Sequence, residues 1–227
     1  MALILSLETS VKVCSVSIYS DNELLGVSEV FIEKSHSRVI TLLVQDLLKG
    51  VNITLNEIDA VSVSHGPGSY TGLRIGVSTA KGLCYALDKP LISVNTLQGM
   101  AASVADSLYE DILICPMLDA RRMEVYCAVY DGRLKEIQKT SAVVVDETSF
   151  RSLLENNKVL FCGNGAGKCK KLLGHAPNAY FLDNVYPSAK YTGRLANVKY
   201  MKGEFEDLAY FEPYYLKEFF LTGKKSN

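Results

Sequence analysis

A buried strand that runs through a glycine-rich turn into a helix constrains the fold of this chain more than any other feature. Residues 60–64 have the pattern of a short, largely apolar strand, and the sequence HGPGSYTG follows them. Residues 71–87 have the pattern of a helix. Backbone N–H groups at such a helix start often bind phosphate. An equally open reading is a tight turn, in which the glycines allow positive φ and Ser69 or Thr71 caps the helix.

The spacing of the glycines does not support either of the two familiar nucleotide-binding loops. Gly66, Gly68 and Gly72 do not fit the dinucleotide pattern G-x-G-x-x-G, and no Gly-Lys-Ser/Thr follows them. Residues 163–169, GNGAGKC, resemble a Walker loop, but one residue is missing and Cys169 stands where a metal-binding Ser or Thr belongs. We therefore expect residues 163–169 to connect a strand to a helix.

Other candidate catalytic groups are sparse. Glu8 and the two hydroxyl residues after it lie in the first hairpin turn, where they could hold a metal and a phosphate. The β-branched Val11 that follows disfavours the positive φ that close approach of a phosphate needs, so we favour a polar turn. Ile40 stands four residues after His36, so the sequence has no H-x-x-x-H metal pair, and it has no serine- or cysteine-hydrolase motif.

The hydrophobic pattern predicts an α/β fold with mixed sheets flanked by helices. The first part of the chain reads as three antiparallel strands, a helix, the strand and helix of the glycine loop, a further strand and a helix. The expected bounds of these elements are 2–9, 12–19, 23–31, 37–49, 60–64, 71–87, 91–94 and 96–105. Gly50 ends the first helix, and the capping box at Thr54–Glu57 predicts a short helical turn.

A polar, acidic stretch at 106–111 divides the chain into two predicted lobes. We expect an N-terminal lobe over residues 1–106 and a smaller C-terminal α/β lobe over residues 107–227. Strands are predicted at 112–118, 124–130, 142–145 and 158–162, and a helix at 149–156. The last part is expected to be helical at 187–200, extended at 213–216 and disordered at 223–227.

The composition indicates a globular protein without a broad nucleic-acid surface. The 227 residues are 48% hydrophobic and 22% charged, and the net charge of −1 leaves no cationic excess to neutralise many phosphates or a membrane surface. The six cysteines form no C-x-x-C pair, and no apolar run reaches the roughly 20 residues that cross a bilayer. With no signal-peptide pattern after Met1, we expect a protein of the reducing cytoplasm.

Two predicted helices of the N-terminal lobe carry more apolar surface than one core face needs. In residues 37–49 the apolar positions span roughly 180° of the helix, against ~100° for a single core face. In residues 71–87, small residues on the second side would let another backbone approach closely. This extra apolar surface could bind a partner protein, or the chain's own sheet and neighbouring helix could cover it, and the sequence leaves both interpretations open. The candidate partner-contact residues are Val39, Leu43, Leu47, Ile75, Thr79, Gly82 and Ala86.

Three motifs and the end of the chain resemble one known family. The motifs are ILSLETS at 4–10, GPGSYTGLRIG at 66–76 and LDARRMEVY at 118–126, and PYYLK at 213–217 also fits. Their order is that of the TsaB family, also called YeaZ, a bacterial subunit of tRNA threonylcarbamoyladenosine synthesis. The middle motif is highly specific, and the resemblance covers nearly the whole chain.

The resemblance implies a two-lobed actin-like ATPase fold of the ribonuclease H-like type, related to sugar kinases and to the catalytic subunit TsaD. It implies that the chain pairs with a TsaD homologue and with the ATPase TsaE to transfer threonylcarbamoyl to the adenosine beside the anticodon of ANN-decoding tRNAs. In the family, TsaD carries the metal-binding histidine pair, and TsaB alone forms homodimers through the same N-terminal helices that meet TsaD. The chain is therefore expected to be noncatalytic and to meet tRNA only through the complex.

The sequence departs from a working actin-like ATPase at both phosphate loops. Kinases of this fold carry an aspartate followed by glycine in the first hairpin, where this chain has Glu8 and Thr9, and residues 119–124 contain no glycine for a second loop. We expect no catalytic, metal or strong cofactor site in this chain alone, with ATP or ADP and magnesium bound at most in the complex. The alternative is a small-molecule kinase or ATPase of the same fold, in which Glu8 and the glycine loop hold magnesium and phosphate.

Overall fold

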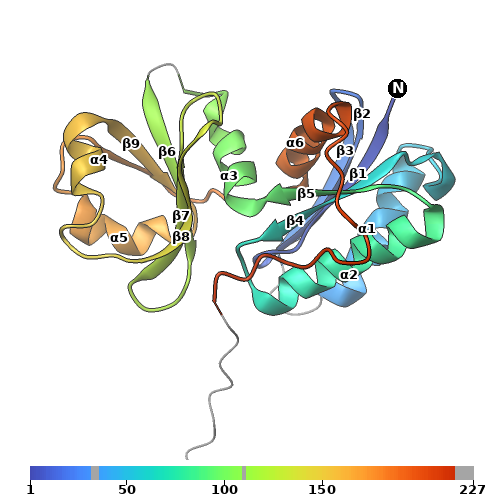
Figure 1. Ribbon diagram of the computed structural model, residues 1–227, viewed down its shortest axis with the longest axis horizontal. Coiled ribbons are helices and arrows are strands. Elements are labelled where there is room, and N and C mark those ends of the chain that lie inside the picture. The colour runs from blue at the N-terminus through green and yellow to red at the C-terminus, as the bar shows by residue number, and fades with distance from the viewer. Residues whose placement is uncertain (32–35, 109–110, 218–227) are drawn as a thin grey trace, which may run out of the picture.

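The computed structural model describes residues 1–31, 36–108 and 111–217, and these form two five-stranded sheets with helices packed on them (Figure 1). The first sheet contains β1 (Leu3–Glu8), β2 (Val13–Ser20), β3 (Glu23–Phe31), β4 (Ala60–Gly66) and β5 (Leu91–Asn95). The second contains β6 (Ile112–Asp119), β7 (Glu124–Tyr130), β8 (Glu136–Val144), β9 (Lys158–Cys162) and β10 (Ala179–Leu182).

The two sheets share one topology. Their strand orders are β3-β2-β1-β4-β5 and β8-β7-β6-β9-β10. In each sheet the first three strands along the chain pair antiparallel, and the last two add in parallel. The predicted architecture of mixed sheets flanked by helices is confirmed.

Side-chain alternation gives the first sheet two different faces. One face is apolar and packs against α1 (His36–Gly50) and α2 (Tyr70–Leu87). The other face carries buried serines and meets α6 (Ala189–Met201). The Ser17 hydroxyl donates to the Ala189 carbonyl at 2.7 Å, and the Tyr19 hydroxyl donates to the Lys190 carbonyl at 2.9 Å.

The position of α6 corrects the predicted lobe bounds. We expected residues 107–227 to form the second lobe, but α6 lies on β1, β2 and β4 of the first sheet, and the chain after it also contacts that lobe. Close packing explains the placement, because a side chain at Gly193 would come within 2.8 Å of the Ser6 hydroxyl and 2.7 Å of the Tyr19 ring. A pattern read along the chain does not show which sheet such a helix of small residues will cover.

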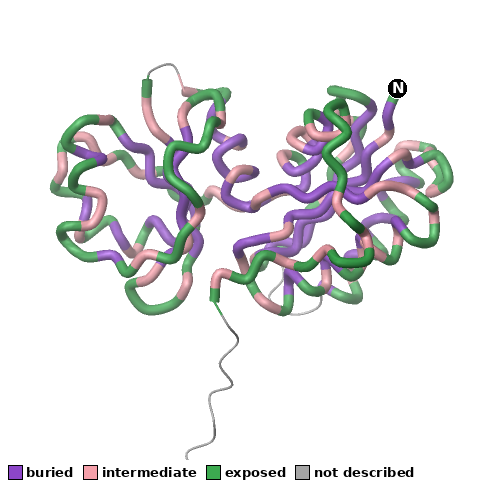
Figure 2. The backbone as a smooth tube through the Cα atoms, viewed as in Figure 1, coloured by how far each residue is buried: buried purple, intermediate pink, exposed green. Residues whose placement is uncertain are grey.

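The second lobe has more regular structure than the sequence predicts. Helices α4 (Arg151–Asn156) and α5 (Ala166–Leu173) pack on its sheet. The predicted connection at 163–169 implied a helix after it without bounds, β10 was not predicted, and β8 is longer than expected. Helix α3 (Thr96–Ala105) packs on β6 and β7 and also against α6, so it connects the lobes. Burial is concentrated in the central strands, whereas most of β8 is exposed (Figure 2).

Two smaller predictions have clear outcomes. The capping box at Thr54–Glu57 is confirmed, since it opens a short 3₁₀ helix (Leu55–Glu57) in which Glu57 accepts the Thr54 N–H at 2.8 Å. The disorder expected at 223–227 lies outside the described residues. Over the ranges that are described, no helix combines the length and the apolar character needed to cross a membrane.

Candidate functional site

The glycine loop meets the turn between β1 and β2 where α2 begins. Ser69 is the N-cap of α2, and its hydroxyl accepts the Gly72 N–H at 3.4 Å. The Ser69 N–H donates to the Ser10 carbonyl at 2.6 Å, and the Thr9 hydroxyl donates to the Gly72 carbonyl at 2.7 Å. The N–H groups of Ser69 and Gly72, which could otherwise face an anion, are therefore bonded within the chain.

The glycines of this loop permit close backbone packing. A Cβ atom at Gly68 would lie 2.5 Å from the Ser10 carbonyl oxygen, and one at Gly72 would lie 2.1 Å from the Thr9 carbonyl oxygen. Gly66 has φ of 129°, which an L side chain rarely adopts. Of the two open readings, the tight turn capped by Ser69 agrees with this geometry.

Glu8 lies inside the molecule at the end of β1. Its side chain is 1% exposed, and its Oε1 accepts the Ser10 N–H at 2.6 Å. Burial raises the pKa of the Glu8 carboxyl above its ordinary value of 4.5, although hydrogen bonds from Ser10 and Ser64 oppose the shift. The carboxylate that the kinase alternative assigns to magnesium is thus enclosed and already bonded.

The raised pKa predicts that Glu8→Gln stabilises the chain at neutral pH. A carboxyl whose pKa rises on folding favours the folded state less as the pH climbs above 4.5, because the unfolded chain ionises first. The variant should unfold at higher urea concentration than the parent at neutral pH, and the difference should vanish below about pH 4, where both states are protonated. Glu23→Gln, at an exposed position, is the control. A pH-independent difference between parent and Glu8→Gln would contradict the prediction.

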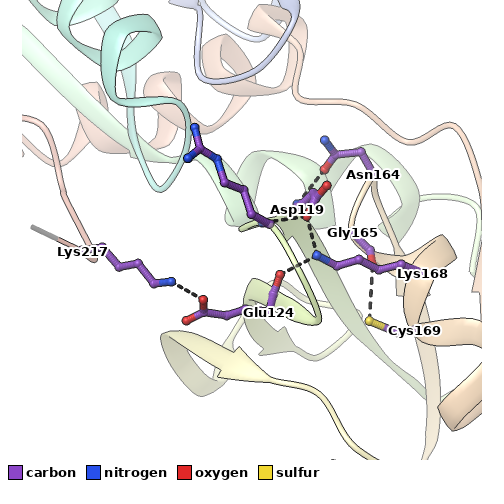
Figure 3. Close-up of polar contacts among 8 residues, drawn as sticks. Asp119, Glu124, Asn164, Gly165, Lys168, Cys169 and Lys217 are labelled. Atoms are coloured by element: carbon purple, nitrogen blue, oxygen red, sulfur yellow. Dashed lines mark hydrogen bonds and ion pairs between the residues drawn. The ribbon is translucent and has the colours of Figure 1, made fainter. Parts of the chain in front are cut away.

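In the second lobe, the turn between β6 and β7 meets residues 163–169, which form a short loop at 163–165 and the first turn of α5 (Figure 3). Lys168 points to this turn, where its ammonium pairs with Asp119 and donates to the Glu124 carbonyl at 2.6 Å. The loop connects β9 to α5, and the Gly165 N–H donates to the Met117 carbonyl at 2.9 Å. A strand-to-helix connection is present but shorter than predicted, because α5 already begins at Ala166, and the cation that suggested a Walker loop lies in that helix and is paired within the chain.

The three histidines serve different local contacts. His36 Nε2 lies 2.7 Å from the Val11 carbonyl oxygen, His65 contacts the rings of Phe211 and Tyr214, and His175 is exposed. In the part of the chain that the structure describes, no three or more His, Cys, Asp or Glu side chains gather into a possible metal-binding group.

The two partner-contact helices are only partly open to solvent. Leu43 and Leu47 are each 8% exposed and belong to the first-lobe core, so their assignment to a partner surface is wrong. The physical reason is that α1 packs on β2, β3 and α2 at once, which uses the wide apolar span within the chain.

The other candidate residues retain accessible surface. Val39, Ile75 and Thr79 are half-buried, while Gly82 and Ala86 are exposed. The sequence reasoning missed two large exposed side chains on these helices, Leu42 and Tyr85, of which Tyr85 is 84% exposed. A helical wheel that included every apolar residue would have placed Leu42 outside the main stripe of α1.

Comparisons with known proteins agree on one family. A family model described as TsaD, tRNA N6-adenosine threonylcarbamoyltransferase, matches residues 12–211. A TsaB protein of Bacillus subtilis is 30% identical over 75% of this chain and 74% of its own length. The chain belongs to the TsaB family. A TsaB protein of Haemophilus influenzae is 27% identical over 94% of this chain and 93% of its own.

Solved structures agree with the fold of this TsaB-family chain. YeaZ from Pseudomonas aeruginosa superposes with a TM-score of 0.84 at 24% identity, covering 95% of this chain and all of that one. The two lobes constitute the actin-like ATPase fold that the resemblance implies. The family's name refers to tRNA threonylcarbamoyladenosine biosynthesis, and this places the chain in that pathway.

Proposed function

We propose that this chain is the noncatalytic partner of a TsaD homologue. Together with a TsaE homologue, the pair transfers threonylcarbamoyl from its adenylate, which leaves as AMP, to the adenosine beside the anticodon of ANN-decoding tRNAs in the cytoplasm. The observation that carries the proposal is the direct packing of the glycine loop on the first hairpin, with Ser69 N–H bonded to the Ser10 carbonyl. Backbone atoms fill the approach that a phosphate would need, so the motif supports the start of α2.

The exposed sides of α1 and α2 are the proposed contact with TsaD. Gly82 and Ala86 present little side-chain bulk, and Leu42 and Tyr85 add apolar surface on the same pair of helices. Small residues allow another helix to approach closely, and aromatic side chains are frequent anchors of interfaces. The same surface pairs two copies of the chain when TsaD is absent, and tRNA is reached only through the complex.

Reconstitution tests the proposal. The purified chain should bind a purified TsaD homologue. With threonylcarbamoyl adenylate, ATP and magnesium supplied, modification of an ANN-decoding tRNA should require this chain, TsaD and TsaE together. Modification at the same rate without this chain, or failure of the chain to bind TsaD, would refute the proposed function.

The kinase or ATPase alternative makes a different prediction for the chain alone. It requires micromolar binding of ATP and magnesium that Glu8→Ala abolishes. Because Glu8 is enclosed and bonded to Ser10 N–H, we expect isothermal titration calorimetry of the lone chain to detect no micromolar binding. Glu23→Ala, at an exposed carboxylate, is the matched control. Binding lost in Glu8→Ala and retained in Glu23→Ala would favour the alternative.

A further inference from the structure

The last described residues form a strap that runs along α2 to the space between the two lobes (Figure 1). This segment, residues 203–217, is named the C-terminal strap. Main-chain groups hold most of it to the first lobe. The Glu206 N–H donates to the Leu91 carbonyl at 2.9 Å, and the Tyr214 N–H donates to the His65 carbonyl at 2.8 Å. Lys81 on α2 donates to the carbonyl of Phe211 at 3.0 Å.

The end of the strap reaches the second lobe through a different kind of contact. The Tyr215 ring still lies against Tyr70 of α2, tilted to it with centroids 4.7 Å apart, and only Lys217 pairs across the lobes with Glu124 at the start of β7 (Figure 3). The Lys217 side chain is 41% exposed and that of Glu124 is 20% exposed. An ion pair open to water is weak and is screened by salt, whereas main-chain hydrogen bonds are not.

The strap would therefore open at the ion pair, which is weaker than the main-chain hydrogen bonds to the first lobe. We propose that the Lys217–Glu124 pair is a reversible clasp between the two lobes, independent of the pairing proposed above. When the pair breaks, the strap stays on the first lobe and the second lobe gains freedom to move about α3. Helix α3 follows β5 directly and packs on the second sheet and on α6, so it holds the lobes together while it limits their motion to a change of angle.

Distances between spin labels test the clasp in the full chain. Cysteines introduced at exposed Asn56 and Lys171 place one label on each lobe, and the six native cysteines are buried. Labelled chain diluted with unlabelled chain removes distances between copies. We expect Lys217→Ala to broaden the interlobe distribution and shift it to longer distances, and we expect 0.5 M salt to do the same to the parent but not to the variant.

Matched variants separate the clasp from general loosening. Lys202→Ala removes an exposed ion pair with Glu204 and should leave the distribution unchanged. The charge-swapped Glu124→Lys, Lys217→Glu double variant should restore the parental distribution, and hydrogen exchange at the Glu206 amide should stay slow throughout. An unchanged distribution in Lys217→Ala, an equal salt response in parent and variant, or loss of protection at Glu206 would each overturn the proposal.

Discussion

Gly72→Ala is expected to destabilise the chain by about 2–3 kcal/mol, the cost of overpacking a site that cannot relax. The new Cβ would lie 2.1 Å from the Thr9 carbonyl oxygen, and Thr9 is itself held by a hydrogen bond to the Gly72 carbonyl. The neighbouring atom belongs to the backbone, so it cannot turn away as a long side chain could. Urea unfolding of the parent and the variant measures the difference in free energy of unfolding.

The matched control lies on the same helix and should have the opposite sign. A Cβ atom at Gly82 would meet no neighbouring group within 4 Å, and the position is exposed, so Gly82→Ala improves helix propensity without a clash. We expect it to stabilise the chain by roughly 0.5–1 kcal/mol. If both variants changed stability equally, the glycine at position 72 would not be required for packing against the first hairpin.

Gly82→Arg is expected to weaken pairing with the TsaD homologue by about 100-fold or more while leaving the chain folded. An arginine there would carry a long side chain and an unpaired charge into a close helix contact, and burying such a charge costs several kcal/mol. Ala86→Glu should act in the same way. Surface-based binding kinetics with immobilised TsaD measures the effect, and analytical ultracentrifugation measures it for the homodimer.

The control for this prediction is the same substitution on a helix of the other lobe. Gly167 lies exposed in α5, so Gly167→Arg adds the same bulk and charge away from the proposed surface. Affinity should stay within about twofold of the parent, as expected for a residue outside an interface. Equal loss of affinity in Gly82→Arg and Gly167→Arg, or no loss in either, would place the partner surface elsewhere.

Local patterns in the sequence predict most of the first lobe. The strand β2, the end of α1 at Gly50 and the hydroxyl cap at Ser69 each depend on neighbours within a few residues, and the structure has all three. In the second lobe the same patterns indicate neither the bounds of α5 nor the strand β10. Helix α5 is only eight residues long, so its buried Ala166, Cys169 and Leu173, although spaced as on one helix face, give a pattern of only about two turns.

At the candidate site, too, the sequence predicts some features and not others. The motif at 66–76 marks the chain as a TsaB relative, and the absence of a histidine pair is visible in the sequence. The apolar width of α1 is visible in the sequence, but at Leu43 and Leu47 it serves the core and not a partner, because the helix touches two strands and a helix together. The number of neighbours that cover a helix face is a property of the assembled lobe.

The sequence by itself determined the α/β class, the glycine-rich turn and the family, because each depends on residue types at short, regular spacing. Tertiary structure alone decided what the glycines contact, that Glu8 is enclosed, and that α6 and the C-terminal strap return to the first lobe. These outcomes depend on contacts between residues far apart along the chain, such as Thr9 with Gly72 and Ser17 with Ala189. The spacing of residues along one segment does not indicate which distant part of the backbone will pack against it.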